Sequence, residues 1–202
     1  MARLKSALPI LAFAVASLPL AAEATTLSVV NVGAPAVNCV FSVTCTMVVT
    51  DSIGNVTPPS DIGVGRLQSR TSPGLLPAPA GGKMDYEYRI DLTSVSAPVV
   101  QNCVTKMTVA FGPVVKMPYP PGPLRDVYVV TSGGLGSVGV TSATQVGNVI
   151  TFNFGTPASG GVCPGQTSFF FGLTSASTTP VASKATLFFS QGGSQSVAAR
   201  RP

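Results

Sequence analysis

Acidic and basic side chains alternate with tyrosines along one short segment of the chain. Asp85, Glu87, Arg89 and Asp91 share one parity, so on an extended strand all four would project from the same face. A glycoside hydrolase uses two carboxylates about 5 to 9.5 Å apart, and two-residue spacing on a strand gives roughly 6.6 Å for Asp85 and Glu87. The four residues are therefore a candidate ligand face.

Catalysis on this face is not the favoured interpretation. Arg89 lies one step from Glu87 and would neutralise a neighbouring carboxylate, and the chain has no tryptophan to stack on a sugar ring. A ladder of alternating charges on a strand is more often a solvated surface of small energetic value. We expect a solvated charge ladder here, and no catalytic residue.

Other catalytic and metal chemistry is restricted by composition. The chain contains no histidine, which removes Ser-His-Asp and Cys-His catalysis and histidine-ligated metal sites. Gly134–Gly139 matches G-x-G-x-x-G, but no acidic residue follows Asp126, so a glycine-rich connection between strands is favoured over a dinucleotide site. No calcium-loop string is present either. We predict no enzyme activity, no cofactor and no metal.

The first 24 residues have the features of a cleaved signal peptide. Arg3 and Lys5 precede an apolar stretch, and Ala22-Glu23-Ala24 offers a small-x-small cleavage site, which predicts a mature chain of residues 25–202. The alanine-rich leader is typical of bacterial export, and no apolar run of about twenty residues follows it. The expected location is secreted, extracellular or periplasmic, without a transmembrane helix.

Four cysteines, Cys39, Cys45, Cys103 and Cys163, fit two disulfides in an oxidising compartment. On one regular strand, Cys39 and Cys45 would lie roughly 20 Å apart and could not pair with each other. A bend near Phe41 would instead allow a local pair and leave Cys103 to join Cys163. The pairing stays open between these alternatives.

The mature chain is predicted to be one all-β domain, an antiparallel β-sandwich of about nine strands braced by disulfides. Gly, Pro, Ser, Thr and Val dominate, and helical spacing of apolar residues is absent after the leader. The strand candidates are residues 27–32, 37–49, 64–69, 85–92, 99–111, 126–131, 148–154, 167–173 and 185–190. Residues 72–82 are interpreted as a surface loop, with an interdomain linker as the alternative. Simple alternation along residues 167–173 would expose Phe170. We favour burial of this strand on both faces over an exposed Phe170 that contacts a partner.

The function expected from these features is an exported structural or interaction module of a cell surface, matrix or adhesive layer. Twelve basic and seven acidic residues give a net charge of +5, but the basic residues are scattered, which does not favour nucleic-acid binding. Self-association, or a glycan or protein partner, is compatible with the low charge. The segments to follow are residues 72–82, 133–139 and 169–171. A carbohydrate- or calcium-binding module is the alternative, ahead of a carboxylate hydrolase or a small outer-membrane barrel.

Overall fold

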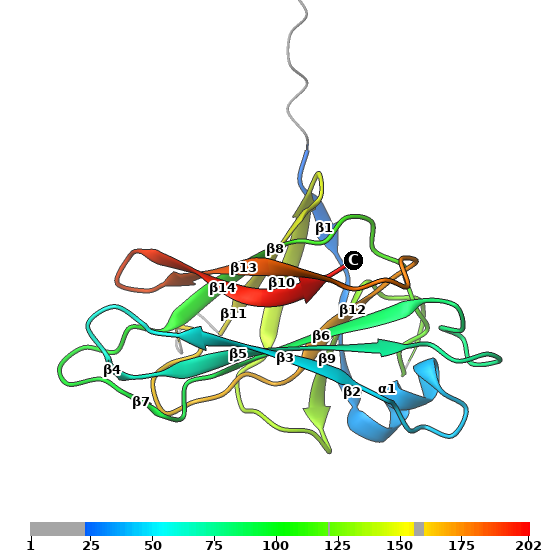
Figure 1. The fold of residues 1–202 in the computed structure, drawn as a ribbon, viewed down its shortest axis with the longest axis horizontal. Coiled ribbons are helices and arrows are strands. Elements are labelled where there is room, and N and C mark those ends of the chain that lie inside the picture. The colour runs from blue at the N-terminus through cyan, green and yellow to red at the C-terminus, as the bar shows by residue number, and fades with distance from the viewer. Residues whose placement is uncertain (1–22, 121, 156–159) are drawn as a thin grey trace, which may run out of the picture.

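The computed structural model describes residues 23–120, 122–155 and 160–202, and it shows two packed β-sheets with one short helix (Figure 1). Residues 1–22 of the predicted signal peptide lie outside the described ranges, so export stays a prediction. In the part of the chain that is described, no helix has the length and apolarity needed to span a membrane.

Each of the two large sheets has six strands. The first sheet contains, in spatial order, β1 (Thr25–Leu27), β10 (Val140–Val146), β11 (Val149–Phe154), β8 (Val104–Ala110), β13 (Val181–Phe189) and β14 (Ser194–Arg201). The second sheet contains β2 (Val29–Gly33), β9 (Val127–Ser132), β12 (Phe171–Ser175), β6 (Met84–Asp91), β5 (Gly65–Pro73) and β3 (Thr50–Val56). A small ladder pairs β4 (Ile62–Gly63) with β7 (Val95–Ser96).

The main core lies between the two large sheets. Alternation along β6 directs Tyr86, Tyr88 and Ile90 into it, where they are fully buried. Phe152 of β11 and Phe171 of β12 meet there with their ring centroids 4.9 Å apart. The all-β, sandwich-like, disulfide-containing fold expected from the sequence is thus confirmed.

One continuous segment forms an edge of both sheets. β1 pairs antiparallel with β10, and β2 pairs parallel with β9, so the chain changes sheets at Ser28. The Ser28 amide and hydroxyl donate to Asp126 Oδ2 at 2.8 and 2.6 Å, which fixes the crossover. The expectation of a purely antiparallel sandwich is therefore wrong at this edge.

On the opposite side, the backbones of the two sheets approach closely. The amide of Arg200 on β14 donates to Ser69 Oγ at 3.0 Å, and Tyr88 Oη donates to the Arg200 carbonyl at 2.8 Å. Gly54 of β3 makes this approach possible, because a Cβ there would lie 2.7 Å from the Ala198 carbonyl oxygen and would also collide with Val197. The free edge of the first sheet is covered here by the second.

The predicted strand 37–49 is wrong. Residues Ala34–Phe41 form the helix α1, which begins with Pro35 in its first turn, and the chain then continues as a loop to residue 49. Val37, Val40 and Phe41 are buried with helical spacing, a pattern that coexists with the alternation of apolar residues in this segment. The absence of helix expected after the leader is therefore also wrong.

The estimate of about nine strands is too low, since 14 strands lie within the described residues. The long strands that went unrecognised are β3, β10 and β14, which are rich in Ser, Thr, Gly, Gln and Ala and lack continuous apolar alternation. Their pairing with neighbours, rather than their own pattern, makes them strands.

The four cysteines form the two disulfides Cys39–Cys45 and Cys103–Cys163. The local pair forms because Cys39 lies in α1 and Cys45 lies in the following turn, where its φ is 56°. The pair Cys103–Cys163 links the residue just before β8 to the connection between β11 and β12. The alternative pairings, in which Cys39 and Cys45 each bond to Cys103 or Cys163, are excluded, because they required a regular strand over residues 37–49.

Two of the segments singled out from the sequence are connections between consecutive strands. Residues 74–83 join β5 to β6, which pair antiparallel, so this segment is a loop of a hairpin rather than a linker. Residues 133–139 join β9 to β10. The glycine-rich connection expected from the G-x-G-x-x-G string is confirmed.

The close approach at Gly54 gives a stability prediction. Gly54→Ala should lower the free energy of unfolding by about 1–3 kcal/mol, because the added methyl group overpacks the backbone of β14. Gly139→Ala is the matched control, since a Cβ there would meet neighbouring carbons only at 3.7 and 3.9 Å. Denaturant unfolding of both variants checks this, and equal stability would contradict the close packing.

The two disulfides should differ in their contribution to stability. Loop-closure entropy assigns about 4 kcal/mol to Cys103–Cys163, with a sequence separation of 60, and about 2 kcal/mol to Cys39–Cys45, with a separation of 6. Urea unfolding of the two double Cys→Ser variants measures the difference. A larger loss for Cys39–Cys45 would show that α1 depends on its disulfide more than the sandwich does on Cys103–Cys163.

Candidate functional site

A second apolar layer covers the outer face of the second sheet. α1 lies there beside β2 and β9 (Figure 1), and it packs with the segment around Met117, the 74–83 loop and the outward side chains of β9. The buried members of this layer are Val32, Val37, Val40, Phe41, Ala80, Met117, Tyr119, Tyr128, Val130 and Phe170. Both faces of the second sheet are therefore covered at this position.

This layer buries the predicted charge ladder. Asp85 is 1% exposed and Arg89, the most exposed of the four residues, is 8% exposed. The four side chains do share one face of β6, as alternation predicted, but the expectation that this face is solvated is wrong. The reason is the unpredicted helix and the loops that accompany it.

Asp85 and Glu87 meet at one tyrosine hydroxyl. Tyr128 Oη lies 2.8 and 2.9 Å from the two oxygens of Asp85 and 3.0 Å from Oε1 of Glu87. Gly172 of β12 lies between Tyr128 and Glu87, because it pairs with Tyr128 of β9 on one side and with Glu87 of β6 on the other. A Cβ on Gly172 would lie 2.5 Å from the tyrosine Cζ. The missing side chain of Gly172 is what lets the ring cross β12 and reach both acids.

This arrangement alters the acidity of all three groups. Burial raises the pKa of Asp85 well above its ordinary value, and the neighbouring charge of Glu87 raises it further. Burial also raises the pKa of Glu87, against the lowering effect of Arg70. The pKa of Tyr128 is raised well above its ordinary value by burial and by Asp85, so Tyr128 remains a hydroxyl donor. Two acids this close retain a proton more readily than isolated ones.

Arg70 connects this pair to the surface. Its guanidinium lies 3.5 Å from Glu87 Oε2 and 3.5 Å from Asp51 Oδ1. It also stands over the ring of Phe170, 4.8 Å from the centroid, and Arg89 stands 5.2 Å from the same centroid. Phe170 is buried, as favoured from the sequence, and two cations cover it.

Asp91 has a separate set of partners. Arg66 donates to it at 2.9 and 3.1 Å, Arg89 donates at 3.1 Å, and the Thr93 hydroxyl donates at 2.6 Å. Burial raises the pKa of Asp91, but the hydrogen bonds from Thr93 and Arg66 outweigh it, so this pKa lies below the ordinary value. Asp91 is therefore a stable anion within an ion-pair network.

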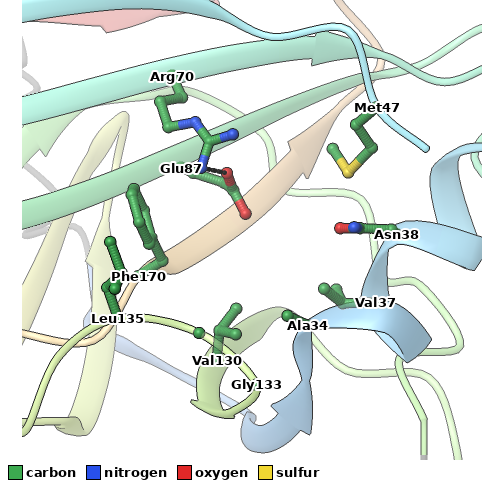
Figure 2. Close-up of a pocket in the computed structure, with 11 residues that line it drawn as sticks. Ala34, Val37, Asn38, Met47, Arg70, Glu87, Val130, Gly133, Leu135 and Phe170 are labelled. Carbon is green, nitrogen blue, oxygen red and sulfur yellow. Dashed lines mark ion pairs between the residues drawn. The ribbon is translucent and has the colours of Figure 1, made fainter. Parts of the chain in front are cut away.

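A cavity of about 270 Å³ opens beside Glu87, between α1 and the outer face of the second sheet (Figure 2). Its lining consists of Ala34, Val37, Asn38, Met47, Arg70, Glu87, Val130, Gly133, Gly134, Leu135 and Phe170. Figure 2 shows the Glu87 carboxylate directed into the space, the Phe170 ring along one wall and the Asn38 amide across from them. We call this space the Glu87 cavity.

The structure brings together only part of the predicted ligand face. Glu87 lines the cavity, Asp85 lies behind it on Tyr128, and Arg89 and Asp91 form the neighbouring ion-pair network. Two segments singled out from the sequence, 133–139 and 169–171, also contribute to the lining. Within the described ranges, no group of three or more His, Cys, Asp or Glu side chains is placed to hold a metal ion.

Comparisons of the chain with protein-family models, curated proteins and solved structures found no match. The site is therefore interpreted from its own geometry. In that geometry Asp85 is enclosed and reaches no open surface, whereas Glu87 lines the cavity.

Sequence reasoning missed Arg70, Tyr128 and Gly172 as parts of the site. Each comes from a different strand, and strand order in a sheet cannot be read from local alternation. A usable signal was present in β6 itself, because four charged residues opposite an unbroken apolar face need partners if both faces are covered. Arg66 and Arg70 of β5, the strand that the structure pairs with β6, are such partners.

The raised pKa of Asp85 predicts an unusual pH dependence of stability. A folded pKa above the unfolded value means that stability from this group is fully present below about pH 4 and is lost as pH rises through the folded pKa. One proton accounts for a slope of at most about 1.4 kcal/mol per pH unit. Asp85→Asn keeps the shape and an acceptor for Tyr128, so it should become more stable relative to wild type as pH rises.

Chemical unfolding between pH 4 and pH 8 measures this difference. Asp61→Asn, in the connection between β3 and β4, controls for removal of a carboxylate outside the site. If the stability difference between Asp85→Asn and wild type were the same at every pH, Asp85 would not carry the proton.

Proposed function

We propose that the protein is an exported, non-enzymatic interaction module that associates through an apolar surface beside α1. This surface, the apolar tip, consists of Val43, Val48, Leu75 and Leu76. Leu76 is 82% exposed and Val48 is 78% exposed, and exposed apolar groups of this kind are typical of contact surfaces. The exposure of the apolar tip is the observation that supports this function.

The exposure is imposed by ordered loops. The Leu75 amide donates to the Phe41 carbonyl at 2.7 Å, and the Ala80 amide donates to the Val40 carbonyl at 2.9 Å. The disulfide Cys39–Cys45 holds the turn that carries Val43. These loops lie at one end of the second sheet in Figure 1. Their apolar side chains are held in solvent by the backbone rather than by lack of structure.

The partner chemistry follows from charge. Residues 42–49 and 74–81 contain no charged side chain, and charged residues make up 9% of the chain. An uncharged apolar surface fits another of the same kind, and a second copy of this chain provides one in a two-fold, self-complementary contact. We therefore assign the partner as a second copy.

The adjoining edge of the second sheet supports the same assignment. Gln195 bonds through its side chain to the Asn55 carbonyl and the Thr57 amide, so odd-numbered residues of β3 direct their main-chain groups away from β5. By the same alternation, the main-chain groups of Asp51 and Ile53 belong to this outer edge of β3. An open edge of this kind pairs readily with another strand.

Light scattering coupled to size exclusion tests the proposal on full-length chain expressed with its leader and purified after export. The mass should rise towards that of a dimer with concentration, and Leu76→Ser and Val48→Ser should shift the protein to monomer. Val99→Ser is the matched control, because Val99 is 90% exposed in the connection between β7 and β8.

A wild-type monomer at all concentrations would contradict the association. Intact mass of the same material tests the predicted cleavage after Ala24. Calcium-dependent mass or melting temperature would instead favour the calcium-binding alternative, since a ligand of the native state stabilises it.

A further inference from the structure

The Glu87 cavity combines one buried carboxylate with apolar walls. We propose that it is a binding site for a small primary amine with an apolar body, whose ammonium group pairs with Glu87. This site is separate from the apolar tip and does not require self-association.

Glu87 has one oxygen available for a ligand. Tyr128 Oη lies 3.0 Å from Oε1, within hydrogen-bonding distance, and holds this side of the carboxylate. Oε2 faces Arg70 Nη1 at 3.5 Å, which is longer than a good charge-assisted hydrogen bond. Figure 2 shows this carboxylate directed into the cavity, with Asn38 across from it. An ammonium group between the two could donate to a Glu87 oxygen and to the Asn38 amide oxygen.

The charges around the cavity favour a cation with one positive charge. Four carboxylates, Asp51, Asp85, Glu87 and Asp91, surround three guanidiniums, Arg66, Arg70 and Arg89. α1 and residues 133–135, which form the other walls, carry no charged side chain, and Tyr119 and Tyr128 are neutral hydroxyl groups. The group therefore has one uncompensated negative charge when all its carboxylates are ionised.

A proton or an ammonium ion can each compensate that charge. The amine and the proton shared near Asp85 and Glu87 then compete, so binding of one ammonium releases about one proton to solvent. No bond is made or broken other than the O–H bond of that carboxyl group. Affinity should consequently rise with pH until the pair is ionised.

The residues that line the cavity restrict the size and polarity of the part of the ligand that carries the amine. Val37, Met47, Val130, Leu135 and Phe170 are apolar and offer few partners to a hydroxylated ligand. A volume of about 270 Å³ is below the usual range for drug-sized ligands, so the body is a single ring or a short branched chain.

Isothermal titration with 2-phenylethylamine tests the site, and 2-phenylethanol is the neutral control of the same shape. The amine should bind at least tenfold more tightly than the alcohol. Titrations in two buffers that differ in ionisation enthalpy, repeated over a range of pH, should show proton release on amine binding that disappears once the carboxyl pair is ionised. No binding of the amine, equal binding of the alcohol or no proton release would each overturn the proposal.

Glu87→Gln keeps the shape of the side chain and removes its charge, so amine affinity should fall at least tenfold. Asp61→Asn is the matched carboxylate control outside the cavity and should bind the amine as wild type does. Near-ultraviolet circular dichroism checks that Glu87→Gln is folded; if it is not, the proton-release measurement on wild type decides. Unchanged affinity in folded Glu87→Gln would show that the amine binds elsewhere.

Discussion

The hydrogen bonds from Tyr128 to two buried carboxylates are the interaction on which the outer layer depends. Asp85 and Glu87 lose solvent when α1 covers the second sheet, and the tyrosine hydroxyl replaces part of that lost solvation. The bonds exist only because Gly172 has no side chain to block the ring. The helix α1, the Glu87 cavity and the two arginines over Phe170 all lie on the same face of the second sheet as this hydroxyl.

Both faces of the second sheet are covered, so the polar side chains on either face need hydrogen-bond or ion-pair partners. Inward, β6 contributes Tyr86, Tyr88 and Ile90 to the apolar core between the sheets. Outward, the same strand contributes charged side chains that require partners. The partners come from β5 and β9, so the outer layer ties these two strands to β6 through side chains. Such a network of directional hydrogen bonds and ion pairs specifies one arrangement of these strands, whereas apolar packing alone would only bury them.

The fold class could be predicted from the sequence because alternation in β6, β11 and β13 and the apolar run of β9 are local properties. The helix was missed because Val37, Cys39 and Phe41 alternate as a strand does, while Val37, Val40 and Phe41 fit a helix equally well. The solvated interpretation of Asp85 failed for the same reason, since the layer that buries it includes that helix. The site could be located at Glu87, whereas Tyr128, Arg70 and Gly172 reach it through long-range strand pairing that no local pattern encodes.

The crossover at Ser28 has a consequence for the order of folding. Thr25 pairs with Gln145 and Val29 pairs with Val127, so the first strands of the chain find their partners far along it. The second sheet cannot complete that edge until the chain up to Ser132 has been synthesised, and the first sheet cannot do so until β10 has followed, up to Val146. A topology rich in such distant contacts folds slowly, and the part of the chain that emerges first is necessarily among the last to be fixed in place.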